Sequence, residues 1–165
     1  MKRMLFAASI TFLLPLNVWA CTCDASTVRQ SKNNSEVVFS GEIIQIDYID
    51  LYDDRNEPRI VVTFSVNEYW KGNLSKEIKL HTIHNRVSCT GIVSPKIGQK
   101  WLIYAQKYKA TDWLGRGDST FLYVRGAIIP KPNDSILGIF CGYRSNLFQY
   151  STEDLPLLGK GKIPK

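Results

Sequence analysis

Four cysteines have the most distinctive chemistry in this chain: Cys21, Cys23, Cys89 and Cys141. In a small exported domain an even number of cysteines indicates disulfides, here two. A direct Cys21–Cys23 bridge would be strained, because disulfide-linked Cα atoms lie about 4.4–6.8 Å apart with correctly directed Cβ atoms. Two crossed pairings stay open, each joining one N-terminal cysteine to Cys89 and the other to Cys141. A structural zinc site is disfavoured, since its paired cysteines are usually separated by about two to four residues.

Other groups with chemical potential are less specific. His81 and His84 fall where a predicted strand ends, and they lack the glutamate spacing of a zinc protease, so we interpret them as surface histidines. The adjacent carboxylates Asp53-Asp54 and Glu153-Asp154 are typical of solvated turns. The chain has no nucleophile elbow, phosphate loop or cysteine–histidine pair. We therefore expect a protein that is not an enzyme and needs no cofactor.

The first twenty residues predict a removable signal peptide. Lys2 and Arg3 precede an apolar run over residues 4–16, and residues 18–20 end in the small residue that signal peptidase requires. A transmembrane helix needs about 20 apolar residues, and this run is shorter, so we expect no membrane span. The mature chain would begin at Cys21, in a secreted or periplasmic protein. Residues 18–21 also loosely resemble a lipobox, which would place a lipid anchor on Cys21; the bulky Trp19 favours simple cleavage.

Residues 21–165 have the length of one domain with one core. The formal net charge is +6, but the basic residues are scattered and form no stripe with interleaved aromatic residues. This pattern indicates a solvated surface and disfavours nucleic-acid binding. We expect the basic tail Lys160–Lys165 to be frayed.

The elements that must position these residues are mainly strands. Apolar residues follow strand periodicity, with Gly or Pro in every gap, over residues 37–49, 59–70, 77–83, 100–106, 120–125 and 136–141. Gly41 interrupts the first strand where a bulge or barrel corner would bend it. Short helices are expected at the ends, one capped by Asp24 or Ser26 and running to about Gln30, the other opened by residues 151–154. Five or six short strands with terminal helices predict a closed or partly open Greek-key barrel.

Six segments of the sequence, considered together, form a recognisable pattern. They are Cys21-Thr22-Cys23, residues 37–41, 64–72, 88–91 and 98–104, and Cys141. Together they resemble the inhibitory domain of the tissue inhibitors of metalloproteinases, over most of residues 21–165. The resemblance implies an all-β, OB-like Greek-key barrel of five to six strands. It also implies disulfides Cys21–Cys89 and Cys23–Cys141. A third disulfide of that family has no counterpart in this sequence.

The resemblance further implies an exported inhibitor or binder of zinc metalloproteases. The α-amino nitrogen and carbonyl oxygen of Cys21 would chelate the catalytic zinc of the partner, in the open position that otherwise holds water. Cys21, Thr22 and Cys23 would form an inhibitory wedge, with the Thr22 side chain in the protease pocket beside the zinc. Residues Val87, Ser88, Cys89 and Thr90 would form the neighbouring ridge.

A second hypothesis belongs to another class of protein. The chain would be an envelope or extracellular interaction module that binds a protein or polysaccharide through the barrel face and has no protease target. The two hypotheses differ at the mature start. Inhibition requires a free amine on Cys21, whereas a barrel-face binder does not.

Overall fold

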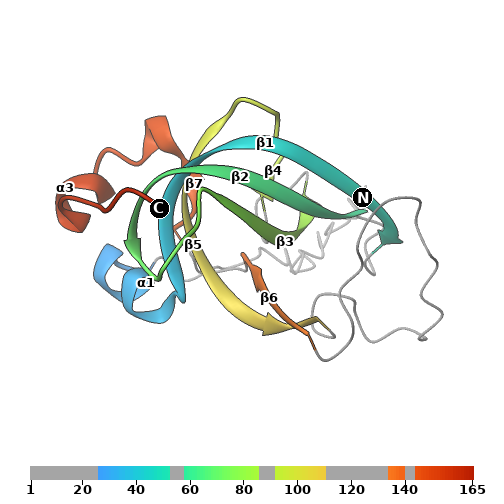
Figure 1. Ribbon diagram of the computed structural model, residues 1–165, viewed down its shortest axis with the longest axis horizontal. Coiled ribbons are helices and arrows are strands. Elements are labelled where there is room, and N and C mark those ends of the chain that lie inside the picture. Colours follow the sequence, from blue (N-terminus) through green and yellow to red (C-terminus); the bar gives the residue numbers. More distant parts are fainter. Residues whose placement is uncertain (1–25, 53–57, 86–91, 111–133, 140–143) are drawn as a thin grey trace, which may run out of the picture.

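The computed structural model describes residues 26–52, 58–85, 92–110, 134–139 and 144–165 (Figure 1). Its elements, in chain order, are α1 Val28–Asn34, β1 Val37–Tyr52, β2 Pro58–Lys71, β3 Glu77–Asn85, β4 Ile92–Val93, β5 Lys100–Lys109, β6 Ser135–Gly138, β7 Asn146–Leu147, the 3-10 helix η1 Phe148–Tyr150 and α3 Asp154–Leu158. None of the helices in this described part of the chain has the length and apolar character needed to cross a bilayer.

Five of the strands close into a barrel. β1 pairs with β2 and β2 with β3, both antiparallel; β3 pairs with β6 in parallel; β6 and β1 both pair antiparallel with β5. Because β5 returns to lie beside β1 after three sequential strands, the connection is a Greek key. β4 pairs with β3, and β7 with β5, outside this ring. The prediction of an all-β, OB-like Greek-key barrel with short helices is confirmed.

The barrel interior is filled by alternate residues of its strands. On β2 these are Ile60, Val62 and Phe64, each fully buried. Phe64 meets Phe39 of β1 edge to face, with ring centroids 5.6 Å apart. Such aromatic pairs contribute about 0.5–1.5 kcal/mol beyond the area that they bury. The alternation seen in the sequence therefore specifies the inner wall of the barrel.

Two glycines allow strands to approach closely. The register of β1 shifts between Ser40 and Gly41, which confirms the predicted bulge. A Cβ on Gly41 would lie 2.8 Å from the carbonyl oxygen of Ser65 on β2. At the parallel junction of β3 and β6, a Cβ on Gly138 would lie 2.7 Å from the carbonyl oxygen of His81. Both positions need glycine because the neighbouring backbone leaves no room for a side chain.

Most predicted strands are confirmed. Those predicted at 37–49, 59–70, 77–83 and 100–106 are β1, β2, β3 and β5, each slightly longer than predicted. The strand predicted at 136–141 is β6 over Ser135–Gly138, and residues 140–141 lie outside the described residues. The strand predicted at 120–125 also lies outside them. The short pairings β4 and β7 were not predicted.

The predictions for the two ends need correction. The N-terminal helix is capped by Thr27 rather than by Asp24 or Ser26, and it continues past Gln30 to Asn34. The C-terminal tail is not frayed, because Tyr69 and Lys162 exchange backbone hydrogen bonds of 2.9 and 2.8 Å. β2 pairs with β3 from Arg59 to Ser65, so the tail meets backbone groups of β2 beyond that pairing. The helix expected after residues 151–154 is confirmed as α3.

A second apolar cluster lies on the outside of the barrel. It joins Val38 of β1 and Leu102 and Tyr104 of β5 to Val28 of α1 and Leu158 of α3. The two helices contact each other at one end of the barrel (Figure 1). β5 is therefore covered on both faces, which explains its unbroken buried run over residues 101–105.

Candidate functional site

The residues of the predicted wedge and its disulfides lie outside the described residues. These are Cys21, Thr22, Cys23, Val87, Ser88, Cys89, Thr90 and Cys141. The two disulfides and the role of the wedge therefore stay predictions. The described chain begins at Ser26, three positions after Cys23, and it resumes after Cys141 at Arg144, also three positions later. These two residues are in direct contact.

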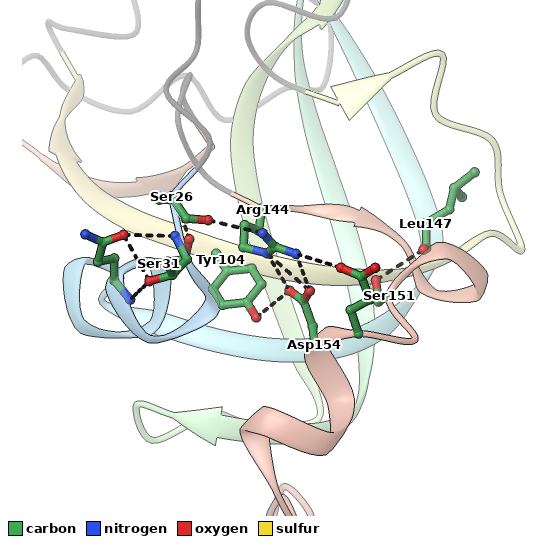
Figure 2. A network of polar contacts seen from close by, with 10 residues as sticks. Ser26, Ser31, Tyr104, Arg144, Leu147, Ser151 and Asp154 are labelled. Carbon is green, nitrogen blue, oxygen red and sulfur yellow. Dashed lines mark hydrogen bonds and ion pairs between the residues drawn. The ribbon is translucent and has the colours of Figure 1, made fainter.

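Arg144 links the N-terminal segment to the C-terminal helix. Its Nη1 donates to the backbone carbonyl oxygen of Ser26 at 3.2 Å. Its Nε donates to both carboxylate oxygens of Asp154 at 3.2 Å, and its Nη2 donates to Oδ1 of the same residue at 2.9 Å. Figure 2 shows Arg144 between Ser26 and Asp154. One guanidinium thus joins segments that are 118 positions apart in the chain.

Asp154 is held from two sides in a buried position. Its side chain is 6% exposed, and the hydroxyl of the fully buried Tyr104 donates to its Oδ2 at 2.8 Å. A buried carboxylate is tolerated when donors surround it, as they do here. The expectation that Glu153-Asp154 is a solvated turn is therefore wrong for Asp154. Glu153 is exposed, with an oxygen 3.9 Å from Nη2 of Arg144.

The electrostatics keep the Tyr104 phenol protonated and the Arg144 guanidinium charged at neutral pH. Burial raises the pKa of Tyr104 well above its ordinary value of 10.0, and the hydrogen bond to Asp154 and its charge raise it further. The hydrogen bond with Asp154 raises the pKa of Arg144, although burial opposes this. The phenol therefore stays a donor and the guanidinium stays charged, so the network has a fixed direction of hydrogen bonding.

The start of α1 is fixed by its own side chains. Thr27 and Gln30 form a capping box: the Gln30 backbone N–H donates to Thr27 Oγ1 at 3.2 Å, and the Thr27 N–H donates to Gln30 Oε1 at 2.9 Å. The hydroxyls of Ser26 and Ser31 are hydrogen-bonded at 2.5 Å. Capping of this kind contributes about 1 kcal/mol. The chain therefore enters α1 along a defined path.

The end of α1 is fixed by the barrel. Lys71 at the end of β2 donates from Nζ to the carbonyl oxygens of Lys32 and Asn33, at 2.9 and 2.8 Å. Gln106 of β5 donates from Nε2 to the carbonyl oxygen of Asn34 at 2.7 Å. A helix of 7 residues has little stability of its own in water. Contacts at both ends and the burial of Val28 therefore hold α1 on the barrel wall.

A polar pocket of about 210 Å³ lies beside this network. It is lined by Arg144, Ser145, Asn146, Tyr150, Ser151 and Asp154. Its two charged residues, Arg144 and Asp154, pair with each other. Within the described ranges no three His, Cys, Asp or Glu side chains come together to hold a metal ion. The pocket therefore adjoins the Arg144–Asp154 pair.

The outer face of β2 and β3 is partly closed. Arg59, Val61 and Thr63 alternate with the core residues of β2 and so face outward, yet they are only 6%, 6% and 3% exposed. Ile49 of β1, the register partner of Arg59, is 1% exposed. OB folds commonly bind their ligands on the face of these strands. In this chain that stretch of the face is buried within the protein itself.

His81 lies on the same outer face, opposite Val61 in the β2–β3 register. It is half-buried rather than a fully exposed surface histidine. Burial lowers its pKa from the ordinary 6.5, a hydrogen bond to the backbone of Leu137 offsets part of the change, and the charge of Lys79 lowers the pKa further. His81 is therefore part of the packing where β3 meets β6.

No protein-family model matches the chain, and no curated protein matches it. The resemblance to the inhibitory domain of the tissue inhibitors of metalloproteinases thus depends on the residues quoted for it.

Sequence reasoning missed the network of Ser26, Tyr104, Arg144 and Asp154. Two local sequence patterns predict the elements next to this network, although not the network itself. Thr27 and Gln30 have the spacing of a capping box, and the apolar run 101–105 indicates a strand covered on both faces. Nothing local indicates that Arg144 pairs with Asp154, because many of the chain's Arg, Asp and Glu residues are equally plausible partners by type.

Proposed function

We propose that the protein is an exported inhibitor of zinc metalloproteases that acts through a free amine on Cys21. The observation that carries the proposal is that α1 is held on a closed OB-like barrel by Lys71 and Gln106 at its end, while Arg144 holds Ser26 just before its start. This platform begins a few residues after the predicted wedge. A wedge fixed before binding loses less conformational entropy when it associates, which strengthens inhibition.

The proposed chemistry requires no metal in the inhibitor. The amine nitrogen and carbonyl oxygen of Cys21 form a five-membered chelate ring on the zinc of the protease and displace its activated water. A nitrogen ligand must carry a lone pair, so the amine binds deprotonated. Thr22 enters the pocket beside the zinc, and residues 87–90 make the second contact.

The contact between Ser26 and Arg144 supports the proposed Cys23–Cys141 disulfide. Each residue follows its cysteine by three positions, and the two are joined by a hydrogen bond of 3.2 Å. Three residues of extended chain span about 10 Å at most, so the contact is compatible with a bridge between the two cysteines that precede these residues. The second proposed bridge, Cys21–Cys89, follows from the resemblance.

The competing hypothesis of a barrel-face binder finds less support. The outward residues Arg59, Val61 and Thr63 are buried within the chain, so this stretch of the β2–β3 face is closed to a protein or polysaccharide. We therefore favour the N-terminus over the barrel face as the binding region.

The test is an inhibition assay against a panel of zinc proteases, using the mature protein and a form with one alanine added before Cys21. We expect the mature protein to inhibit a member of the panel and the extended form to be weaker by several orders of magnitude. Acetylation of the amine has the same effect. Thermal unfolding of the two forms should coincide, which controls for folding.

The pH dependence gives a second arm of this test. The unperturbed pKa of an α-amine is about 7.7–8.0, so inhibition weakens as the pH falls below that range, once the titration of the protease is subtracted. Thr22→Gly has a smaller effect that differs between proteases, because it leaves the chelate intact. Equal inhibition by the mature and extended forms would exclude the N-terminus, and inhibition of no protease would contradict the proposal.

A further inference from the structure

We infer that Arg144 is a positioning residue for the N-terminus and that α3, through Asp154, is part of the inhibitory apparatus. This inference rests on the proposed function, because it concerns how the predicted wedge is held for binding. Its evidence lies in the described residues, where Arg144 contacts Ser26, close in sequence to Cys23.

The simultaneous hydrogen bonds to Asp154 and Ser26 require the planar, branched guanidinium group of arginine. Nε and Nη2 of Arg144 are directed at the Asp154 carboxylate, which leaves Nη1 to reach the carbonyl oxygen of Ser26. Arginine presents several donors in one rigid plane, whereas lysine presents its donors from one nitrogen on a flexible stem. A lysine at position 144 can therefore neutralise Asp154, but it cannot hold both partners at these distances.

The orientation of Arg144 is set by buried groups. Asp154 is fixed by the Tyr104 hydroxyl on one side and by its position in α3, where Leu158 packs into the outer cluster. The Arg144 side chain itself is 31% exposed, so its orientation depends on this partner rather than on enclosure. The direction of Nη1, and with it the position of Ser26, is thus determined by β5 and α3.

The first measurement is made on the free protein without a protease. We compare amide hydrogen exchange over residues 26–34 with exchange over residues 101–105 of β5. Arg144→Lys should raise exchange in the first segment by about tenfold or more, the effect of losing one charge-assisted hydrogen bond, and leave the second unchanged. Arg29→Lys, the same substitution at an exposed position of α1, is the matched control and should change neither.

The second measurement is inhibition by the same variants. Arg144→Lys should weaken inhibition by about 10- to 100-fold, whereas Arg29→Lys should retain it. In the alanine-extended protein, Arg144→Lys should cause no further loss, because both changes act on the same N-terminus. A general loss of structure would instead add to the effect of the extension.

Tyr104→Phe gives a second route if Arg144→Lys disturbs folding. It retains the Arg144–Asp154 pair and removes the Tyr104 hydrogen bond, so its effects should be smaller and in the same direction. Unchanged exchange over residues 26–34 in both Arg144→Lys and Tyr104→Phe would overturn the inference, as would unchanged inhibition by Arg144→Lys. If the unaltered protein inhibits no protease, the proposed function fails, and the exchange data still decide whether Arg144 holds the segment.

Discussion

The inside of the barrel and the structure on its outer wall are stabilised in different ways. The inside is apolar, is built from alternate residues of neighbouring strands, and includes the edge-to-face pair Phe39–Phe64. The outer wall combines an apolar cluster under α1 and α3 with a network in which the partly exposed Arg144 pairs with the buried Asp154, which the buried Tyr104 also contacts. Apolar burial contributes most of the free energy of folding, whereas a buried ion pair contributes little net stability but a defined geometry. We therefore expect the inside to determine stability and the outer wall to determine position.

The largest effect should come from the barrel interior. Phe64→Ala removes a fully buried ring and its edge-to-face contact with Phe39, so the free energy of unfolding should fall by about 3–5 kcal/mol. Urea denaturation followed by circular dichroism measures this change. Tyr150→Ala, at a residue that is 64% exposed, is the control and should stay within about 0.5 kcal/mol of the unaltered protein. A loss at Phe64 below about 1 kcal/mol would mean that the barrel is not the main source of stability.

A smaller and more local effect is expected on the outer wall. Leu158→Ala removes a side chain of α3 that is 6% exposed in the outer cluster. The loss should be about 2–3 kcal/mol, at the lower end for buried leucines, because the cluster lies at the surface and can collapse. Amide exchange should rise in α1 and α3 more than in the barrel strands.

The adjacent Leu157 provides a matched control for this prediction. It lies on the same helix and is 72% exposed, so Leu157→Ala should leave both stability and exchange nearly unchanged. An equal rise in exchange in the barrel strands and in the helices would show that the two regions unfold as one unit. The distinction drawn between them would then be wrong.

The same contrast explains how much the sequence could predict. β1, β2, β3 and β5 follow from local alternation, and Gly41 marks a bulge because only glycine fits against the carbonyl of Ser65. The closure of the barrel is less accessible, since the parallel pairing of β6 with β3 involves residues far apart in the sequence. The number of short strands predicted a closed or partly open Greek-key barrel, and the resemblance implied its OB-like form, but neither specified this pairing.

The structure on the outer wall could not be predicted in the same way, because it depends on contacts between residues far apart in the sequence. Asp154 is an acidic residue beside Glu153 in the sequence, which is typical of a solvated turn, and its burial depends on Arg144 and Tyr104. Likewise, the tail from residue 160 has the composition of a frayed end, and its order depends on the backbone pairing of Lys162 with Tyr69. In both cases the partner, rather than the residue type, determines the structure.

The smallest effect is expected where the barrel closes, and it depends on pH. Burial lowers the pKa of His81 from 6.5, so the folded state favours the neutral imidazole more than the unfolded state does. The resulting stability is fully present above pH 6.5 and is lost as the pH falls through the lower pKa of the folded protein. Between pH 7.5 and pH 5, His81→Gln should therefore lose less stability than the unaltered protein. Urea denaturation at the two pH values measures the difference, and His84→Gln is the control because it removes the other of the two histidines. If His84→Gln reduces the loss of stability at pH 5 and His81→Gln does not, burial of His81 at the junction of β3 and β6 is not the cause of that loss.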